Sequence, residues 1–312
     1  MLIWVASAVL GISKFRENLV YEKPTAPAGI GGVLDDGLRL WRLSLPLTWG
    51  IALIAQAIKT APAILFPAPP IAAASPNLDL AQKIMAMAGA TSRSSLLAVV
   101  FSFIAYIFVN ALLLRINSVS EDRPISFGES VAAGMKLVPR TIGFFMLLGL
   151  MVGLGVIVVL LPAFIMKNLG PAGGIMMGLL VIVGCVLVVY VSVKMVVGYP
   201  AMIVDDLSAT AAIRTSSKLT TGFWWRVAIL LGVLGIIGLA LWAVLGLLGA
   251  AMFGWLGIAS RAPVLVTQLA SVVVYSLLGS LSPAVVLAIY NDLKLRREGG
   301  DLAHRVSALA AQ

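Results

Sequence analysis

Four long stretches without a charged residue constrain this chain more than any other feature of its sequence. Residues 141–166, 168–193, 227–260 and 262–291 contain no Asp, Glu, Lys or Arg. Each stretch exceeds the about 20 residues that a helix needs to cross roughly 30 Å of hydrocarbon. The chain has 61% apolar and 11% charged residues, whereas soluble domains have about 25% charged residues. We therefore expect most of it to lie in a membrane.

The apolar runs, divided at prolines and charges, predict an all-α integral membrane protein with six transmembrane helices. We place the spans at residues 44–66, 95–117, 141–166, 174–197, 227–252 and 264–290. Residues 1–30 form an N-terminal segment, 31–297 the membrane domain and 298–312 a cytoplasmic tail. Residues 1–12 are apolar but too short to span, and no basic residue precedes them. This favours an interfacial helix, or an over-long reading frame, over a signal peptide. The Pro- and Ala-rich residues 67–76 begin the longest outer loop.

The distribution of Lys and Arg predicts the orientation, because basic residues near span ends are retained on the cytoplasmic side. With both termini in the cytoplasm of a bacterial inner membrane, seventeen basic residues lie inside and five outside. The five are Lys59, Lys83, Arg93, Lys167 and Arg261. Topology therefore explains the net charge of +9 better than nucleic-acid binding, for which no separate basic domain is present.

A threefold internal repeat emerges when three short segments are aligned. Gly37-Leu-Arg-Leu, Gly134-Met-Lys-Leu and Ser216-Ser-Lys-Leu each stand before an apolar run. Each predicted repeat is an amphipathic interfacial helix followed by a transmembrane hairpin. Acidic residues begin each interfacial helix and basic residues end it, which suits the helix macrodipole. The acidic residues of the three copies are Asp35 and Asp36, Glu129, and Asp205 and Asp206. Ser126 and Glu129 have the spacing of a capping box.

The interfacial helices supply the first group of candidate functional residues. Cations close to an anionic leaflet are each attracted by roughly 1 kcal/mol, so this group predicts contact with anionic lipid headgroups or with a membrane partner. It consists of Arg39, Arg42, Lys136, Arg140, Arg214, Lys218 and Arg226. A protein partner or a homo-oligomer remains open as an alternative.

Polar residues within the predicted spans form the second group. A polar group in hydrocarbon is costly unless it contacts a partner or a cavity. The group consists of Gln56, Lys59, Asn110, Gln268 and Ser271. These residues fit either a polar path between the spans or, at lower cost, interhelical hydrogen bonds.

Nothing in the sequence predicts an enzyme, a metal site or a cofactor. Asp35 and Asp36 could begin a Mg²⁺-dependent phosphotransferase motif, but no further aspartate follows before Asp79, so helix initiation is the better interpretation. Cys185 is the one cysteine and His304 the one histidine. No span contains Asp, Glu or His, the usual relays of proton-coupled transporters.

The third repeat resembles known families. Within the repeat, the segments on which the resemblance rests are Tyr199-Pro-Ala-Met-Ile-Val-Asp205-Asp206, Ala211-Ala-Ile-Arg214-Thr-Ser216-Ser-Lys218-Leu and Gly222-Phe-Trp-Trp-Arg226. A further segment lies near the end of the chain, Ile289-Tyr-Asn-Asp292-Leu-Lys-Leu-Arg296-Arg297-Glu298-Gly. They resemble the bacterial YciC-like inner-membrane proteins and the membrane domain of glycerophosphodiester phosphodiesterases. The resemblance implies a fold, a compartment and an accessory role in envelope or lipid homeostasis. It implies no catalytic residue, because the chain has no His/Glu/Asp-rich segment for the phosphodiesterase domain.

Three functions follow as hypotheses. The first is a non-enzymatic accessory that acts through its cationic cytoplasmic helices. The second is a permease or lipid conduit that uses the polar residues of the spans. The third is an immunity or resistance protein, which no residue pattern in the sequence indicates.

Overall fold

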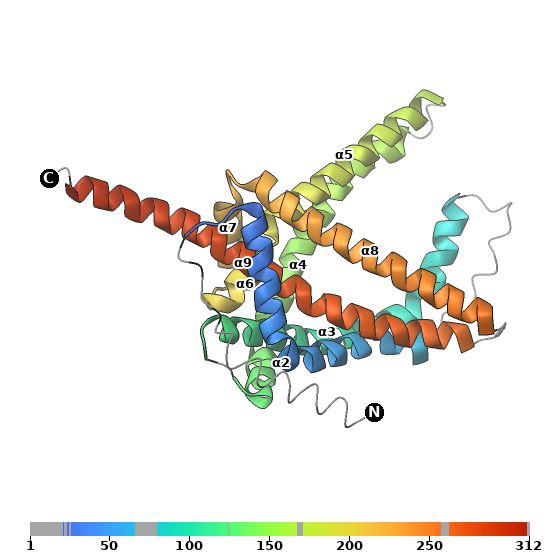
Figure 1. The fold of residues 1–312 in the computed structure, drawn as a ribbon. Helices are drawn as coiled ribbons and strands as arrows, with labels where there is room; N and C mark the ends of the chain where they lie inside the picture. Colours follow the sequence, from blue (N-terminus) through green and yellow to red (C-terminus); the bar gives the residue numbers. More distant parts are fainter. Residues whose placement is uncertain are drawn as a thin grey trace, which may run out of the picture.

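The computed structural model describes residues 21, 24, 26–65, 80–123, 125–166, 171–256 and 262–310. This part of the chain is almost wholly helical and contains no strand (Figure 1). The helices, in chain order, are α2 (Ile30–Leu65), α3 (Leu80–Ser120), α4 (Phe127–Met166), α5 (Pro171–Met195), α6 (Gly198–Val204), α7 (Ala209–Thr220), α8 (Trp224–Leu256) and α9 (Ala262–Ala310). The predicted all-α class is confirmed.

Five segments of the described chain are long and apolar enough to cross a membrane, and a sixth results if α7 and α8 count as one bent span. The five are Ile30–Ala61, Val100–Ser120, Phe127–Val159, Gly173–Val204 and Tyr275–Arg297. A multi-pass membrane protein is therefore confirmed. The predicted N-terminal segment up to residue 20 and the loop at 67–76 lie outside the described residues.

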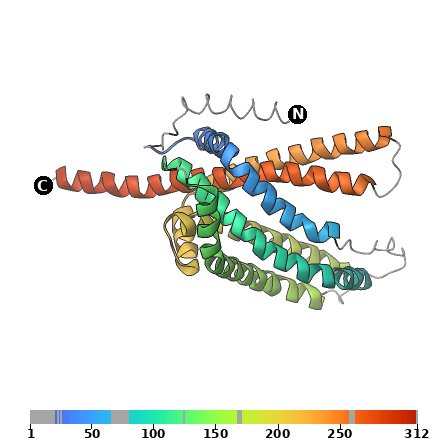
Figure 2. The ribbon, with the colours of Figure 1, turned by 90° about the horizontal axis from the view of Figure 1, so that it is seen from below.

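α9 is the central helix of the described structure. In the most apolar 18-residue stretch of its Tyr275–Arg297 segment 71% of the residues are buried, against 6% in the corresponding stretches of the Phe127–Val159 and Gly173–Val204 segments. α2 packs against α9 and α3, and α4 packs against α3 and α5. Figures 1 and 2 both show the C-terminal part of α9 projecting beyond the other helices. The apolar surfaces of α4 and α5 thus remain available to hydrocarbon, which is as good a solvent for them as a protein core.

The interfacial segments of the three predicted repeats differ in the structure. Those of the first two continue without a break into the spans of α2 and α4, whereas α7 is a separate helix bent by 101° from α8. The break occurs where Thr221 is extended and Gly222 has a φ of 87°, a conformation that glycine adopts at low cost. The threefold layout stays a prediction.

The three aligned positions nevertheless share one property, a close approach of the interfacial segment to another helix. A Cβ atom on Gly37 would lie 2.9 Å from Val285 Cα of α9, and one on Gly134 would lie 2.5 Å from Ile107 O of α3. Ser216, at the third position, is fully buried and donates to Lys194 O at 2.8 Å. Small residues are needed here because they let helices approach closely.

The predicted capping box at the start of α4 is present. Ser126 N donates to Glu129 Oε2 at 2.8 Å, and Glu129 N donates to Ser126 Oγ at 3.3 Å. Each side chain therefore satisfies a backbone N–H group that the helix itself leaves without a partner.

Candidate functional site

The charged residues gather where several helix ends meet, a region that we name the basic end. It comprises the first turns of α2, α4 and α8, the last turns of α3 and α5, all of α6 and α7, and α9 from Tyr290 to Arg297. Figure 1 shows α6, α7, the first part of α2 and the middle of α9 converging there. Lys59, by contrast, lies near the other end of α2.

α7 is an amphipathic helix with a cationic exposed face. Its first turn is capped by Ser208, whose Oγ accepts from Ala211 N at 3.4 Å. Ala212, Ser216, Leu219 and Thr220 are buried. Ser216 and Thr220 donate to Lys194 O at 2.8 and 3.2 Å, which holds α7 on the end of α5.

Arg214 and Lys218 lie on the opposite face of α7 and are exposed. The structure shows no ion pair for either of them within the described part of the chain. Arg214 is two positions before Ser216 and Lys218 is two positions after it. Both cations therefore lie roughly half a turn around the helix from the buried Ser216. This face is therefore free to meet anionic groups outside the protein.

The two acidic residues that we expected to begin the third interfacial helix instead end α6. Asp205 is the C-cap of α6, and Asp206 has a φ of 51°. Leu207 N donates to Met202 O at 3.1 Å, so the chain closes α6 with a Schellman-type motif before Ser208 starts α7. That expectation was wrong, because a left-handed residue cannot continue into a helix.

Both carboxylates connect neighbouring helices. Asp205 accepts from Lys294 Nζ at 2.9 Å and from the Tyr290 hydroxyl, both on α9. Asp206 forms an ion pair with Arg140 of α4. The Arg140 and Asp206 side chains are 45% and 78% exposed, so this pair contributes little to stability but remains open to other polar groups.

Asp292 is the centre of a buried charge cluster, which we name the Asp292 clamp. Its carboxylate accepts from Arg226 Nε at 3.1 Å, from Arg296 Nε at 2.9 Å and from Ala28 N at 3.0 Å. Both guanidinium groups also donate to Ala28 O, each at 2.5 Å. The clamp therefore joins α8, α9 and the segment before α2 through five hydrogen bonds.

Tyr21 adds a second attachment for the segment before α2. It is buried, and its hydroxyl donates to Asp36 Oδ2 at 2.9 Å. Burial, together with the nearby Asp36 carboxylate, raises the pKa of Tyr21. The neutral phenol is therefore the form that the folded chain favours.

The predicted lipid-contact cations have different surroundings. Arg39 and Arg42 on α2 and Lys136 on α4 are exposed, like the two cations of α7. Arg140 is paired with Asp206, and Arg226 belongs to the Asp292 clamp, with its side chain 17% exposed. Contact with lipid stays a prediction for all of them.

The residues of the predicted polar path are not joined in the described structure. Asn110 is fully buried; its Nδ2 donates to Gly134 O at 3.1 Å, and its Oδ1 accepts from Thr141 at 3.0 Å and Tyr199 at 2.8 Å. These bonds join α3, α4 and α6. Gln56 is half-buried and Lys59 exposed on α2, whereas the side chains of Gln268 and Ser271 lie outside the described residues.

Two tryptophan–serine hydrogen bonds fasten α2 to α9. Trp41 Nε1 donates to Ser280 Oγ at 2.9 Å, and Trp49 Nε1 donates to Ser276 Oγ at 3.0 Å. Both serines are fully buried. Polar side chains of this part of the last span therefore serve helix–helix contact.

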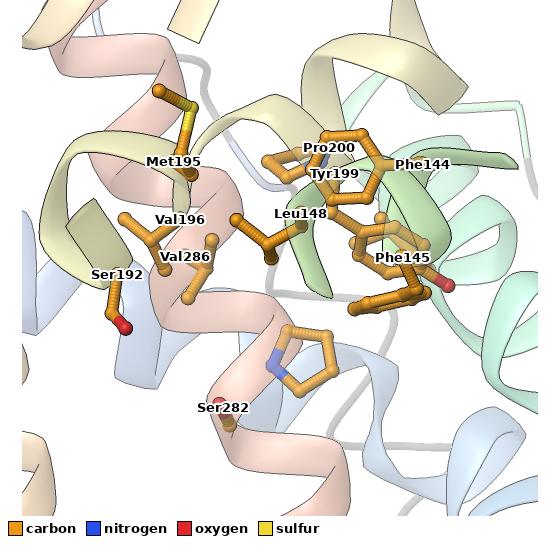
Figure 3. Close-up of a pocket in the computed structure, with 12 residues that line it drawn as sticks. Phe144, Phe145, Leu148, Ser192, Met195, Val196, Tyr199, Pro200, Ser282 and Val286 are labelled. Carbon is orange, nitrogen blue, oxygen red and sulfur yellow. The ribbon is translucent and has the colours of Figure 1, made fainter. Parts of the chain in front are cut away.

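A pocket of about 340 Å³ lies between α3, α4, α5, α6 and α9 (Figure 3). Its lining residues are Leu113, Phe144, Phe145, Leu148, Ser192, Met195, Val196, Tyr199, Pro200, Ser282, Pro283 and Val286. None is charged, and nine are apolar. Sequence reasoning missed this pocket, because its walls come from segments between Leu113 and Val286 and no local pattern marks them.

Comparison with known proteins identifies one family. Residues 91–291, well over half of the chain, match the family model described as the membrane domain of glycerophosphoryl diester phosphodiesterase. No curated protein and no solved structure matches the chain. The resemblance to that membrane domain is thereby confirmed, while the likeness to YciC-like proteins stays a prediction.

Proposed function

Because the chain belongs to the family of the membrane domain of glycerophosphoryl diester phosphodiesterase, we propose that it is a non-enzymatic accessory in envelope or lipid homeostasis. In this proposal it lies in a bacterial inner membrane with its basic end and both termini in the cytoplasm. It acts by holding anionic lipid headgroups of the cytoplasmic leaflet on α7.

The observation that carries the proposal is the exposed pair Arg214 and Lys218. The buried face of α7 is held by the hydrogen bonds of Ser216 and Thr220 to Lys194 O, so the cationic face has a defined direction. Trp224 and Trp225 begin α8, the next helix after α7, and Trp225 is 75% exposed. Tryptophan is enriched at the headgroup depth of membranes, which is where a helix of this kind lies.

A non-enzymatic role is supported by the engagement of the acidic groups at the basic end. Asp205, Asp206 and Asp292 each bind a Lys or Arg side chain. Each of these contacts joins neighbouring helices, which indicates a structural role for the three carboxylates.

Changing both Arg214 and Lys218 to Gln should weaken binding of anionic lipid. Each cation is attracted by roughly 1 kcal/mol, so the double variant should lose about 2 kcal/mol, on the order of thirtyfold in affinity. The measurement is the rise in melting temperature of the detergent-solubilised chain as phosphatidylglycerol is added, with phosphatidylcholine as the reference lipid.

Lys59→Gln is the matched control, because Lys59 is also exposed but lies away from α7. It should keep the phosphatidylglycerol response of the unchanged chain. In cells, the double variant should also fail to restore the envelope phenotype of a deletion strain. An unchanged preference for phosphatidylglycerol in the double variant would remove the basis of the proposal.

A further inference from the structure

The apolar pocket described above is suited to a hydrocarbon chain. Its volume of about 340 Å³ falls in the range of roughly 300–1,000 Å³ found for ligand sites. No charged group lines it, so a charged ligand part would be left without a partner inside. The Tyr199 hydroxyl is already engaged with Asn110. The remaining polar groups, Ser192 and Ser282, are two hydroxyls among nine apolar side chains.

Charged side chains stand beyond the pocket on the side that is nearer to the basic end. Arg140, Phe144 and Leu148 are four residues apart on α4, so they follow one face of the helix. Phe144 and Leu148 line the pocket, and Arg140 stands one turn, about 6 Å, beyond Phe144. α9 repeats the pattern with Val286 in the pocket wall and Lys294 two turns further on.

Each of these cations is accompanied by a carboxylate from the end of α6. Arg140 pairs with Asp206, and Lys294 pairs with Asp205 at 2.9 Å. The Arg140–Asp206 pair is the more exposed of the two. An exposed guanidinium retains donors for a phosphate group, and Asp206, at 78% exposure, can accept from an ammonium group. The Arg140–Asp206 ion pair thus stands about one helical turn beyond the Phe144 wall of the pocket.

We propose that the pocket holds an acyl chain of a zwitterionic phospholipid whose phosphate contacts Arg140 and whose ammonium group contacts Asp206. Apolar walls suit the chain, and the paired charges suit a headgroup that carries both signs. An anionic lipid would match Arg140 but would place its charge beside Asp206 without compensation. The site is separate from the cations of α7, so the proposal goes beyond the proposed function and does not depend on it.

The experiment fills the pocket and measures the lipid that remains bound. The full chain is purified in a mild detergent from membranes that contain phosphatidylethanolamine and phosphatidylglycerol, and retained lipid is measured by native mass spectrometry. The unchanged chain should retain one phosphatidylethanolamine. Val286→Trp, which places an indole in the pocket, should lower this retention by about tenfold or more.

Val186→Trp is the matched control, because Val186 is 63% exposed on α5 and does not line the pocket. It should retain phosphatidylethanolamine like the unchanged chain. Ser282→Phe is a second filling variant that adds a ring without replacing a packed apolar side chain. It should also lose the lipid, with its helix content by circular dichroism unchanged.

Headgroup specificity is tested with Arg140→Gln. This variant should lower retention of phosphatidylethanolamine and leave the phosphatidylglycerol response of α7 intact, whereas the Arg214/Lys218 double variant should do the opposite. Equal retention in Ser282→Phe and the unchanged chain, or a preference of the pocket for phosphatidylglycerol, would overturn the proposal. So would retention of detergent alone.

Discussion

Replacing Asp292 with alanine should lower the free energy of unfolding by roughly 3–5 kcal/mol, the cost of removing one partner from a buried ion pair. The Arg226 and Arg296 side chains are 17% and 23% exposed and share this one carboxylate. Without it, two largely buried guanidinium groups would repel each other. The Ala28 N–H would also lose its acceptor at 3.0 Å. The measurement is the loss of folded protein on titration with a denaturing detergent.

The same change should release the segment that precedes α2. Chymotrypsin cleavage after Tyr21, which is buried in the unchanged chain, should therefore become faster in Asp292→Ala. Asp35→Ala is the control, because Asp35 is exposed on the first turns of α2 and lies outside the clamp. Equal stability and equal cleavage rates in the two variants would show that the clamp does not hold the segment.

Gly134→Ala should be the most damaging glycine-to-alanine change among the described glycines, because its Cβ would make the shortest contact of any of them. The new Cβ would lie 2.5 Å from Ile107 O and 2.9 Å from Ala111 N. These are backbone atoms of α3, so no side-chain rotation can relieve the contact. α3 and α4 must separate, which costs about 1–3 kcal/mol for overpacking. The hydrogen bond from Asn110 Nδ2 to Gly134 O would be strained as well.

Gly149→Ala is the matched control on the same helix, since a Cβ there meets no atom within 4 Å. It should leave the melting temperature unchanged or raise it, because alanine favours helix by up to about 1 kcal/mol. Thermal unfolding of the two variants in one detergent separates the contact from any general effect of replacing a glycine. A melting temperature of Gly134→Ala equal to that of Gly149→Ala would show that α3 and α4 tolerate the extra carbon.

Sequence reasoning was most successful where the cause lies within a few residues. The capping box of Ser126 and Glu129 forms as predicted, because both partners belong to one helical turn. The amphipathic character of α7 could also be predicted from the sequence, since its buried and exposed residues alternate with the helical period. The role of Asp205 and Asp206 was misjudged, because a break between two helices depends on backbone angles that two adjacent aspartates do not specify.

Long apolar runs by themselves determined that this chain is a multi-pass helical membrane protein, because a helix is the only open structure that satisfies its own backbone in hydrocarbon. The tertiary structure alone decided which helix is central, which polar groups meet and where the pocket lies. Ala28 and Asp292 bond across 264 positions of the chain, and Asn110 and Tyr199 bond across 89. Hydropathy specifies that each span enters the membrane, but lipid accepts every apolar face equally, so only close packing at small residues and hydrogen bonds between helices select the neighbours.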